Sequence, residues 1–250
     1  MSLKIVGFGP GNQSVMTADA ISAIKNSEII VGYTGYIDFV QNLNPSAEII
    51  QTGMMGERER CRIAVERALE GKQVCVVSSG DAGVYGMASL IYEMSAPFPE
   101  IEIEVVPGVT AALSCGAILG SPVSNDFATV SLSNLLTPWD VIEKRLRGAA
   151  LGDFVICVYN PTSRNRADNL RKACEILLET KPAGTFCGIV KNAYRTGQEH
   201  YYCTLGELKD KKADMFTTII IGNESTKMIN GKMVTARGYE SKYGGVTSER

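Results

Sequence analysis

Short apolar runs alternate with amphipathic segments along most of the chain. The run at residues 3–7 (LKIVG) predicts a strand, while residues 17–26 place Ala20, Ile21 and Ile24 on one face of a helix. Continuous apolar strands separated by helices indicate a largely parallel sheet covered on both faces. Further strands are expected at 28–33, 73–80, 101–108, 154–159, 185–192, 201–205, 216–222 and 232–236, and further helices at 57–71, 86–94, 137–146, 164–180 and 205–210.

Two of these helices carry clear start signals. Thr17 stands where a cap of the first helix belongs. Before the helix at 137–146, Thr137 is expected to be the cap, with Pro138 in the first turn and Asp140 completing a capping box. Both starts therefore predict helices with satisfied first turns.

The alternation is interrupted at residues 119–129 (LGSPVSNDFAT), where Gly, Pro, Ser and Asn gather. We therefore expect an α/β protein of two domains, an N-terminal domain at 1–120 and a C-terminal domain at 126–240, followed by a tail at 241–250. The first should contain a mostly parallel sheet. The second is richer in β structure, so its sheet is expected to be mixed in strand direction.

The composition excludes several classes of protein. Of the 250 residues, 45% are hydrophobic and 21% charged, as in an ordinary folded protein. The formal net charge of −2 provides no basic surface for nucleic acid. No apolar run approaches the ~20 residues of a membrane span, so we expect a soluble, cytoplasmic protein that binds no membrane.

The seven cysteines are widely spaced, without a CxxC pair, and His200 is the only histidine. The chain therefore lacks the local ligand supply of a zinc or iron–sulfur site, and no protein metal site is expected. Most cysteines lie within apolar runs, where they act as small buried hydrophobes in a reducing compartment.

A glycine-rich turn follows the first strand in KIVGFGPGN. A dinucleotide fold would have GxGxxG, but here Asn12 stands at the third glycine position. The acidic residue expected after the next strand is also missing, because Glu28 precedes that strand. A nicotinamide cofactor is thus disfavoured, and a plain tight turn or a different ligand loop stays open.

Two further turns of small residues follow strands, in VVSSGDAGVYGMASL and in VVPGVTAALSCGA. Ligands of open α/β sheets bind at the carboxyl ends of strands, and small residues let a backbone approach a ligand closely. These turns therefore predict a ligand site, the alternative being glycine-rich connections.

The fourth turn, in VYNPTSRNRADNL, places Arg164 and Arg166 in the first helical turn after Thr162 or Ser163. Positive side chains there oppose the helix dipole. A bound anion would explain them, because backbone N–H groups and two guanidinium groups would hold it. The alternative is a solvated helix end.

Taken in order, these motifs resemble the tetrapyrrole methylase family, through VGFGPGN, SSGDAGVYG and VVPGVTAA. The later stretches SLSNLLTPWDVIEKRL and YNPTSRNR are similar to the branch that methylates carbon 17 in cobalamin synthesis. The resemblance implies a two-domain tetrapyrrole methylase fold, usually a homodimer, with S-adenosyl-L-methionine between the domains and S-adenosyl-L-homocysteine as product. The substrate would be an anionic tetrapyrrole, precorrin-3B or cobalt-factor III, so that any cobalt arrives with it.

By motif position, the resemblance assigns residues to the cofactor and to the substrate. Arg164 and Arg166 suit substrate carboxylates, and Asn134 would also contact substrate. The expected cofactor contacts are Pro10, Ser79, Gly80, Asp81, Val84, Thr110, Ala111, Asn160 and Ala193.

The carbon-17 branch also contracts the macrocycle, which requires proton transfer. The resemblance points to Asp126 and Ser133 for this step. The chain departs from the branch at Asn125 and Asn134, where histidine and aspartate are expected. Alternatives are a tetrapyrrole methylase acting at another corrin carbon, a diphthine synthase-like protein methylase, or a non-catalytic adenosine-binding regulator.

Overall fold

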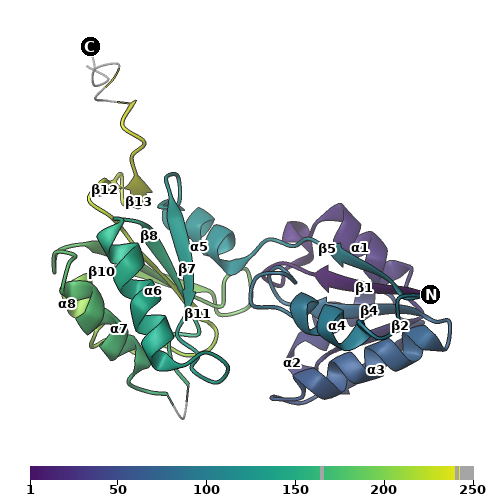
Figure 1. Cartoon of the computed structure of the whole chain (residues 1–250). Helices are drawn as coiled ribbons and strands as arrows, with labels where there is room; N and C mark the ends of the chain where they lie inside the picture. The colour runs from purple at the N-terminus through teal and green to yellow at the C-terminus, as the bar shows by residue number, and fades with distance from the viewer. Residues whose placement is uncertain (164–165, 240–241, 243–250) are drawn as a thin grey trace, which may run out of the picture. The chain divides into compact units, whose positions relative to one another are not determined.

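The computed structural model describes residues 1–163, 166–239 and 242 (Figure 1). Two compact units are present, Met1–Ala111 and the described chain from Ala112 onward. The contacts thus place helix α5 (Ala111–Leu119) almost entirely in the second unit, although it falls within the first sequence-based range. The domain ranges 1–120 and 126–240 stay predictions.

The first unit is built on a five-stranded sheet in the order β3-β2-β4-β1-β5. All of its pairs are parallel, as the continuous apolar strands predicted. Its strands are β1 (Ser2–Gly7), β2 (Ile29–Tyr33), β3 (Glu48–Thr52), β4 (Gln73–Ser78) and β5 (Glu102–Val106).

Helices cover both faces of this sheet (Figure 1). One core packs α3 (Glu57–Leu69) and α4 (Ala88–Ser95) on one face, while α1 (Ala18–Lys25) and α2 (Thr34–Ile37) pack on the other. The short 3₁₀ helices Gln13–Val15 and Gln41–Leu43 complete the unit. The Thr17 cap is confirmed, because its side chain accepts a hydrogen bond from the Ala20 N–H at 3.1 Å.

The second unit contains a mixed sheet in the order β10-β9-β11-β8-β7, in which only β7 and β8 pair in parallel. A second small sheet has the order β12-β13-β6. The strands are β6 (Gly120–Ser121), β7 (Phe127–Ser131), β8 (Val155–Tyr159), β9 (Phe186–Lys191), β10 (Glu199–Thr204), β11 (Thr217–Ile221), β12 (Thr226–Ile229) and β13 (Lys232–Thr235).

Helices α6 (Trp139–Leu151), α7 (Asn169–Leu178) and α8 (Leu205–Leu208) pack on one face of the mixed sheet. Helix α5 packs against the other face. A glycine permits this approach, because a Cβ at Gly188 in β9 would lie 2.5 Å from the Leu119 side chain. The mixed sheet is therefore also covered on both faces.

Two predicted helix starts were wrong. Helix α6 begins at Trp139, so Pro138 is its cap, without a side-chain hydrogen bond, and the capping box from Thr137 does not form. Helix α7 begins at Asn169, which places Arg166 three residues before the helix. The argument from the helix dipole therefore does not apply to Arg166, and Arg164 lies outside the described residues.

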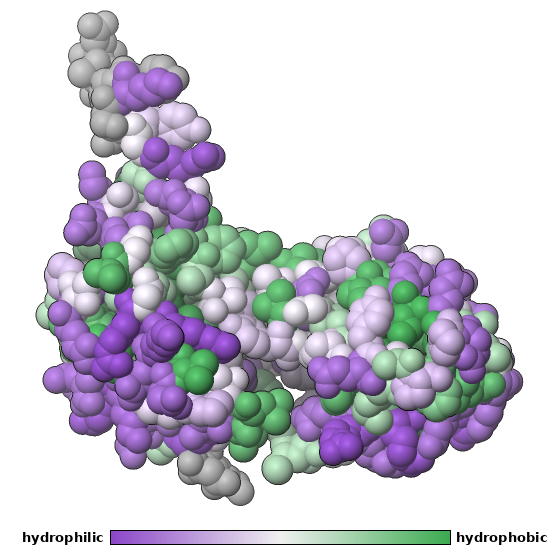
Figure 2. Space-filling view, in the orientation of Figure 1, coloured by the Kyte–Doolittle hydropathy of each residue, from purple (hydrophilic) through white to green (hydrophobic). Residues whose placement is uncertain are grey.

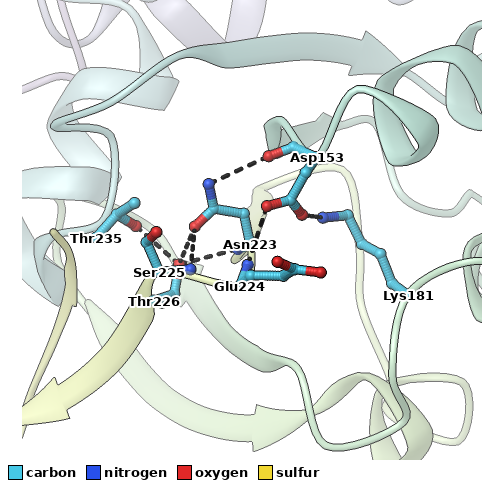
Figure 3. Close-up of polar contacts among 7 residues, drawn as sticks. All are labelled: Asp153, Lys181, Asn223, Glu224, Ser225, Thr226 and Thr235. Carbon is cyan, nitrogen blue, oxygen red and sulfur yellow. Dashed lines mark hydrogen bonds and ion pairs between the residues drawn. The ribbon is translucent and has the colours of Figure 1, made fainter. Parts of the chain in front are cut away.

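A polar network at the amino end of β8 joins three segments of the second unit (Figure 3). The Lys181 ammonium, on the segment after α7, contacts the Asp153 carboxylate at 2.9 Å and is almost fully buried. Asp153 also accepts the Glu224 N–H at 3.2 Å, and its carbonyl accepts the Asn223 amide at 3.1 Å. The pair borders a cavity of about 290 Å³. These bonds fix the loop between β11 and β12 against the start of β8.

Hydrophilic residues cover much of the face in Figure 2, with apolar patches between them. Within the described residues no helix is long and apolar enough to cross a membrane. All seven cysteines are buried, as the apolar runs predicted, and none of them forms a disulfide. Burial raises the pKa of the Cys75 thiol to about 12, so that thiol stays protonated at neutral pH.

Candidate active site

The glycine-rich turns of the first unit join at the carboxyl edge of its parallel sheet. Gly9 and Gly80 exchange backbone hydrogen bonds of 3.0 and 2.8 Å, which ties the turn after β1 to the turn after β4. Both glycines have left-handed φ values, 74° and 71°. Because residues with a Cβ rarely adopt this conformation, glycine is required at both positions.

The third turn packs even more closely. A Cβ at Gly108 would lie 2.2 Å from the Gly80 carbonyl oxygen and 2.3 Å from that of Gly7. These distances are far below van der Waals contact, so Gly108 allows three backbones to meet. The glycines therefore first serve the packing of the turns against one another.

Asp81 organises the same edge with its side chain. One carboxylate oxygen accepts the Gly83 N–H at 2.8 Å, and the other accepts the Gly108 N–H at 3.0 Å. Each oxygen retains a further lone pair for a ligand. Asp81 is thus a fixed acceptor group at the carboxyl edge.

Most cofactor residues predicted in the first unit lie in these turns. A Cβ at Gly80 would lie 3.6 Å from the Thr110 Cα and 3.8 Å from the Ala111 nitrogen. Pro10 is buried between Gly9 and Gly11, while Ser79 and Val84 are half-buried. The structure therefore brings Gly80, Asp81 and the Thr110–Ala111 pair together.

The second unit presents its predicted residues at one edge of the mixed sheet. Strands β7, β8 and β9 run in the same direction, because β11 is antiparallel to both β8 and β9. Their carboxyl ends lead into Ser133, Asn160 and Ala193, respectively. Asn160 has a φ of 50°, and so has Asn192, which precedes Ala193. Asparagine is one of the few residues besides glycine that adopts this conformation readily, so both positions suit tight turns at the strand ends.

A chain of hydroxyl groups and one guanidinium connects two loops at this edge. Arg166 donates from Nη1 to the Ser133 hydroxyl, and from Nε to the Ser163 hydroxyl at 2.8 Å. The Asn160 side-chain amide donates to the Ser131 hydroxyl at 3.1 Å, and Ser131 Oγ also accepts the Ser133 N–H at 3.3 Å. A predicted substrate residue and a predicted catalytic residue are therefore in direct contact.

Asp126 lies at the other end of β7 from Ser133. It precedes the strand, its carbonyl accepts the Val155 N–H, and its residue is exposed. At about 3.3 Å per residue, the five-residue strand places about 13 Å of backbone between the two ends. The structure therefore does not bring Asp126 and Ser133 to one reacting atom, whereas exposed Asn134 stays beside Ser133.

The sequence did not indicate Tyr159, the last residue of β8. Its hydroxyl accepts the Ala112 N–H at 2.7 Å, an amide of the first turn of α5 that the helix itself leaves unbonded. The sequence feature that indicates such a residue is a tyrosine at the end of an apolar strand. His200 is exposed on β10, 6.0 Å from the Tyr202 ring, and the described residues contain no group of side chains able to hold a metal ion.

Both units thus carry loops at the carboxyl edge of a sheet, where the ligands of open α/β sheets bind. The family model of the tetrapyrrole (corrin/porphyrin) methylases matches residues 2–209, and the chain belongs to this family.

Individual relatives refine the comparison. The chain is 44% identical to the "Probable cobalt-factor III C(17)-methyltransferase" of Salmonella typhimurium, over 95% of this chain and 99% of that protein. The crystal structure of the methyltransferase CobJ shares 34% identity with a TM-score of 0.87, covering 94% of this chain and 99% of that one. A uroporphyrin-III C-methyltransferase of Thermus thermophilus, solved with S-adenosylhomocysteine, shares the fold at 20% identity and a TM-score of 0.72, covering 89% and 97%.

Proposed function

We propose that this chain is an S-adenosylmethionine-dependent methyltransferase of cobalamin biosynthesis. It methylates carbon 17 of cobalt-factor III or precorrin-3B and contracts the ring of the same substrate. The near full-length identity of 44% to a protein named for this reaction carries the proposal. That identity extends across both units, because the match covers 95% of this chain.

The edge of the first unit fits S-adenosylmethionine, which supplies a methyl group on a sulfonium for displacement by a carbon nucleophile. The Gly9–Gly80 contact and the Asp81 bonds hold the turns rigid before a ligand binds. Such preorganisation matters because in-line transfer depends on positioning. The contacts proposed are those the sequence predicted: Pro10, Ser79, Gly80, Asp81, Val84, Thr110, Ala111, Asn160 and Ala193.

Arg166 would bind and orient an acidic side chain of the tetrapyrrole. A guanidinium has five N–H groups, and two of those of Arg166 contact Ser163 and Ser133. The remaining donors suit a carboxylate in bidentate geometry. Asn134 and Arg164 stay predicted substrate contacts.

We infer that Ser133, rather than Asp126, acts on the same part of the substrate as Arg166, because Arg166 contacts Ser133. The Arg166 guanidinium donates to its hydroxyl oxygen, which favours the deprotonated form of that hydroxyl. Ser133 could therefore take part in the proton movements of ring contraction. If Asp126 also acts, it serves a different group, because it lies at the opposite end of β7.

The test is incubation of the full chain with methyl-labelled cofactor and either cobalt-factor III or precorrin-3B. A single labelled methyl group at carbon 17, identified by mass and NMR, is expected. Label at another corrin carbon would replace the proposal with a different tetrapyrrole methylase, and label on a protein substrate would point to a protein methylase. A homodimer in the cytoplasm is also expected, and sedimentation of the purified chain tests the dimer.

A further inference from the structure

A buried arginine lies beneath the carboxyl edge of the first unit's sheet. Arg60, in the first turns of α3, is only 4% exposed. Its Nη2 donates to the Gly53 carbonyl at 3.3 Å, and its Nη1 lies 3.6 Å from the Met87 sulfur. The guanidinium also lies over the Tyr33 ring, 6.0 Å from the ring centre. All of these neighbours are neutral.

As far as the structure describes the chain, the Arg60 guanidinium lacks both a hydrogen-bond partner for one nitrogen and a counter-ion. Among the described residues, its Nε is the one buried side-chain nitrogen or oxygen without a hydrogen-bond partner. No ion pair within the described part of the chain joins Arg60 to a carboxylate. Burial lowers the pKa of the guanidinium, although it stays charged at neutral pH. Buried charges are usually paired, because an unpaired one destabilises the fold.

The position of Arg60 indicates which kind of group would pair with its guanidinium. Tyr33 ends β2, Gly53 directly follows β3, and Met87 closes the loop after β4. These are three neighbouring strands of the parallel sheet, so Arg60 lies under the edge where ligands of such sheets bind. Met87 also directly follows the SSGDAGVYG turn that supplies proposed cofactor contacts.

The Gly53–Gly56 turn beside Arg60 is largely exposed. The Gly56 N–H donates to the Gly53 carbonyl at 3.3 Å, the same oxygen that accepts Arg60 Nη2. Met55 holds a left-handed φ of 64° and is 77% exposed, and Met54 is 55% exposed. Strain at Met55 and few buried contacts favour rearrangement of this turn, which would uncover the guanidinium.

We propose that Arg60 binds a carboxylate of a ligand at this edge, with the Gly53–Gly56 turn moving aside. This inference rests on the proposed function, in which two ligands carry carboxylates. The first source is an acidic side chain of the tetrapyrrole, and the second is the methionyl carboxylate of the cofactor. A guanidinium with a free Nε and a weakly bonded Nη suits a bidentate pair with either.

The experiment compares Arg60→Met, Arg60→Gln and Arg60→Lys with wild type, by calorimetric binding of cobalt-factor III, S-adenosylhomocysteine and 5′-methylthioadenosine. The last compound lacks the methionyl carboxylate. Arg58→Gln is the matched control, because Arg58 is an exposed arginine on the same helix. If the tetrapyrrole is the source, its dissociation constant should rise at least tenfold in Arg60→Met and Arg60→Gln, with both adenosine ligands unchanged. If the cofactor is the source, only S-adenosylhomocysteine should weaken.

Thermal unfolding separates ligand binding from a structural role. Arg60 forms no ion pair with any residue that the structure describes, and its guanidinium is desolvated, so Arg60→Met should leave the melting temperature unchanged or raise it. Arg60→Lys should recover part of the affinity, since it restores the charge without the bidentate geometry. A lower melting temperature with all three ligands unaffected would overturn the inference. The binding measurements do not require methyl transfer, so they test the role of Arg60 even if the chain does not catalyse the proposed methylation.

Discussion

The buried ion pair of the second unit should respond unequally to the loss of its two partners. The Lys181 side chain is 3% exposed, whereas that of Asp153 is 40% exposed. Asp153→Asn therefore leaves an ammonium in the interior without its counter-ion. Lys181→Met leaves a carboxylate that water can reach and that still accepts the Glu224 N–H. The aspartate variant should be the less stable of the two.

The exposure of the two side chains determines how much unfolding free energy each variant loses. Removing one partner of a fully buried pair costs ~3–5 kcal/mol. Because Asp153 is partly hydrated, we expect ~2–3 kcal/mol for Asp153→Asn, and about 1 kcal/mol for Lys181→Met, which loses a hydrogen bond to a charged group. Asparagine tolerates the left-handed φ of 49° at position 153, so backbone strain should add little. The double variant should resemble Lys181→Met, which gives a coupling between the two residues of ~2–3 kcal/mol.

Trp139 provides the assay. It is the only tryptophan of the chain, it begins α6, and it packs against the core of the second unit. Its fluorescence during urea unfolding therefore reports on this unit. Arg171→Met is the control, because the Arg171–Asp210 pair is more than half exposed on both sides and should contribute at most ~0.5 kcal/mol. Equal losses for the two single variants, or additive losses in the double variant, would refute the reasoning.

Three further predictions concern the loops and the thiols. Gly108→Ala should weaken S-adenosylhomocysteine binding at least tenfold and destabilise the first unit by ~2–4 kcal/mol, because the added Cβ would lie 2.2 Å from the Gly80 carbonyl oxygen. Calorimetry measures the affinity and thermal melts measure the stability. Unchanged values of both would contradict the packing argument. Arg166→Gln should raise the KM for cobalt-factor III at least tenfold without changing the S-adenosylhomocysteine Kd, whereas a structural arginine would lower the melting temperature and leave KM unchanged. Cys203 should be the first thiol labelled by Ellman's reagent at pH 8, because a hydrogen bond from Cys187 lowers its pKa. Burial raises the pKa of five other thiols to about 11 or 12, those of Cys61, Cys75, Cys115, Cys157 and Cys174. Mass mapping that finds another cysteine labelled first would contradict this prediction.

The sequence predicted the central strands of both five-stranded sheets, but only two of their four edge strands, β5 and β10. Strands β4 and β8 are continuous apolar runs because helices cover both of their faces. Strands β3 and β7 lie at sheet edges, and most of their residues are only half-buried. EIIQT and FATVS consequently lack the apolar continuity on which the prediction depended, and both were missed, as was the short β12.

The candidate site was predictable where local sequence alone determines the backbone. Glycines after β1 and β4 predicted tight turns or ligand loops, and Gly9 and Gly80 lie in such turns with left-handed φ values. The contact between Arg166 and Ser133 was not predictable, because the two residues belong to different loops and meet only through the pairing of β7 with β8. The incomplete bonding of Arg60 was hidden for the same reason, since ERERCR reads as an exposed charged helix start.

The carboxyl edges of the two sheets are built from different groups, and each set of groups suits the ligand proposed for that unit. In the first unit, glycines and Asp81 fix backbone groups in place, which suits a cofactor of constant shape. In the second, the Arg166 guanidinium and serine hydroxyls meet in the loops that follow β7 and β8, which suits the recognition of acidic side chains. Members of one methylase family that share a cofactor would then differ mainly in side chains of the second unit. Substrate choice should therefore change with loops such as 131–134 and 161–166 while cofactor affinity is retained.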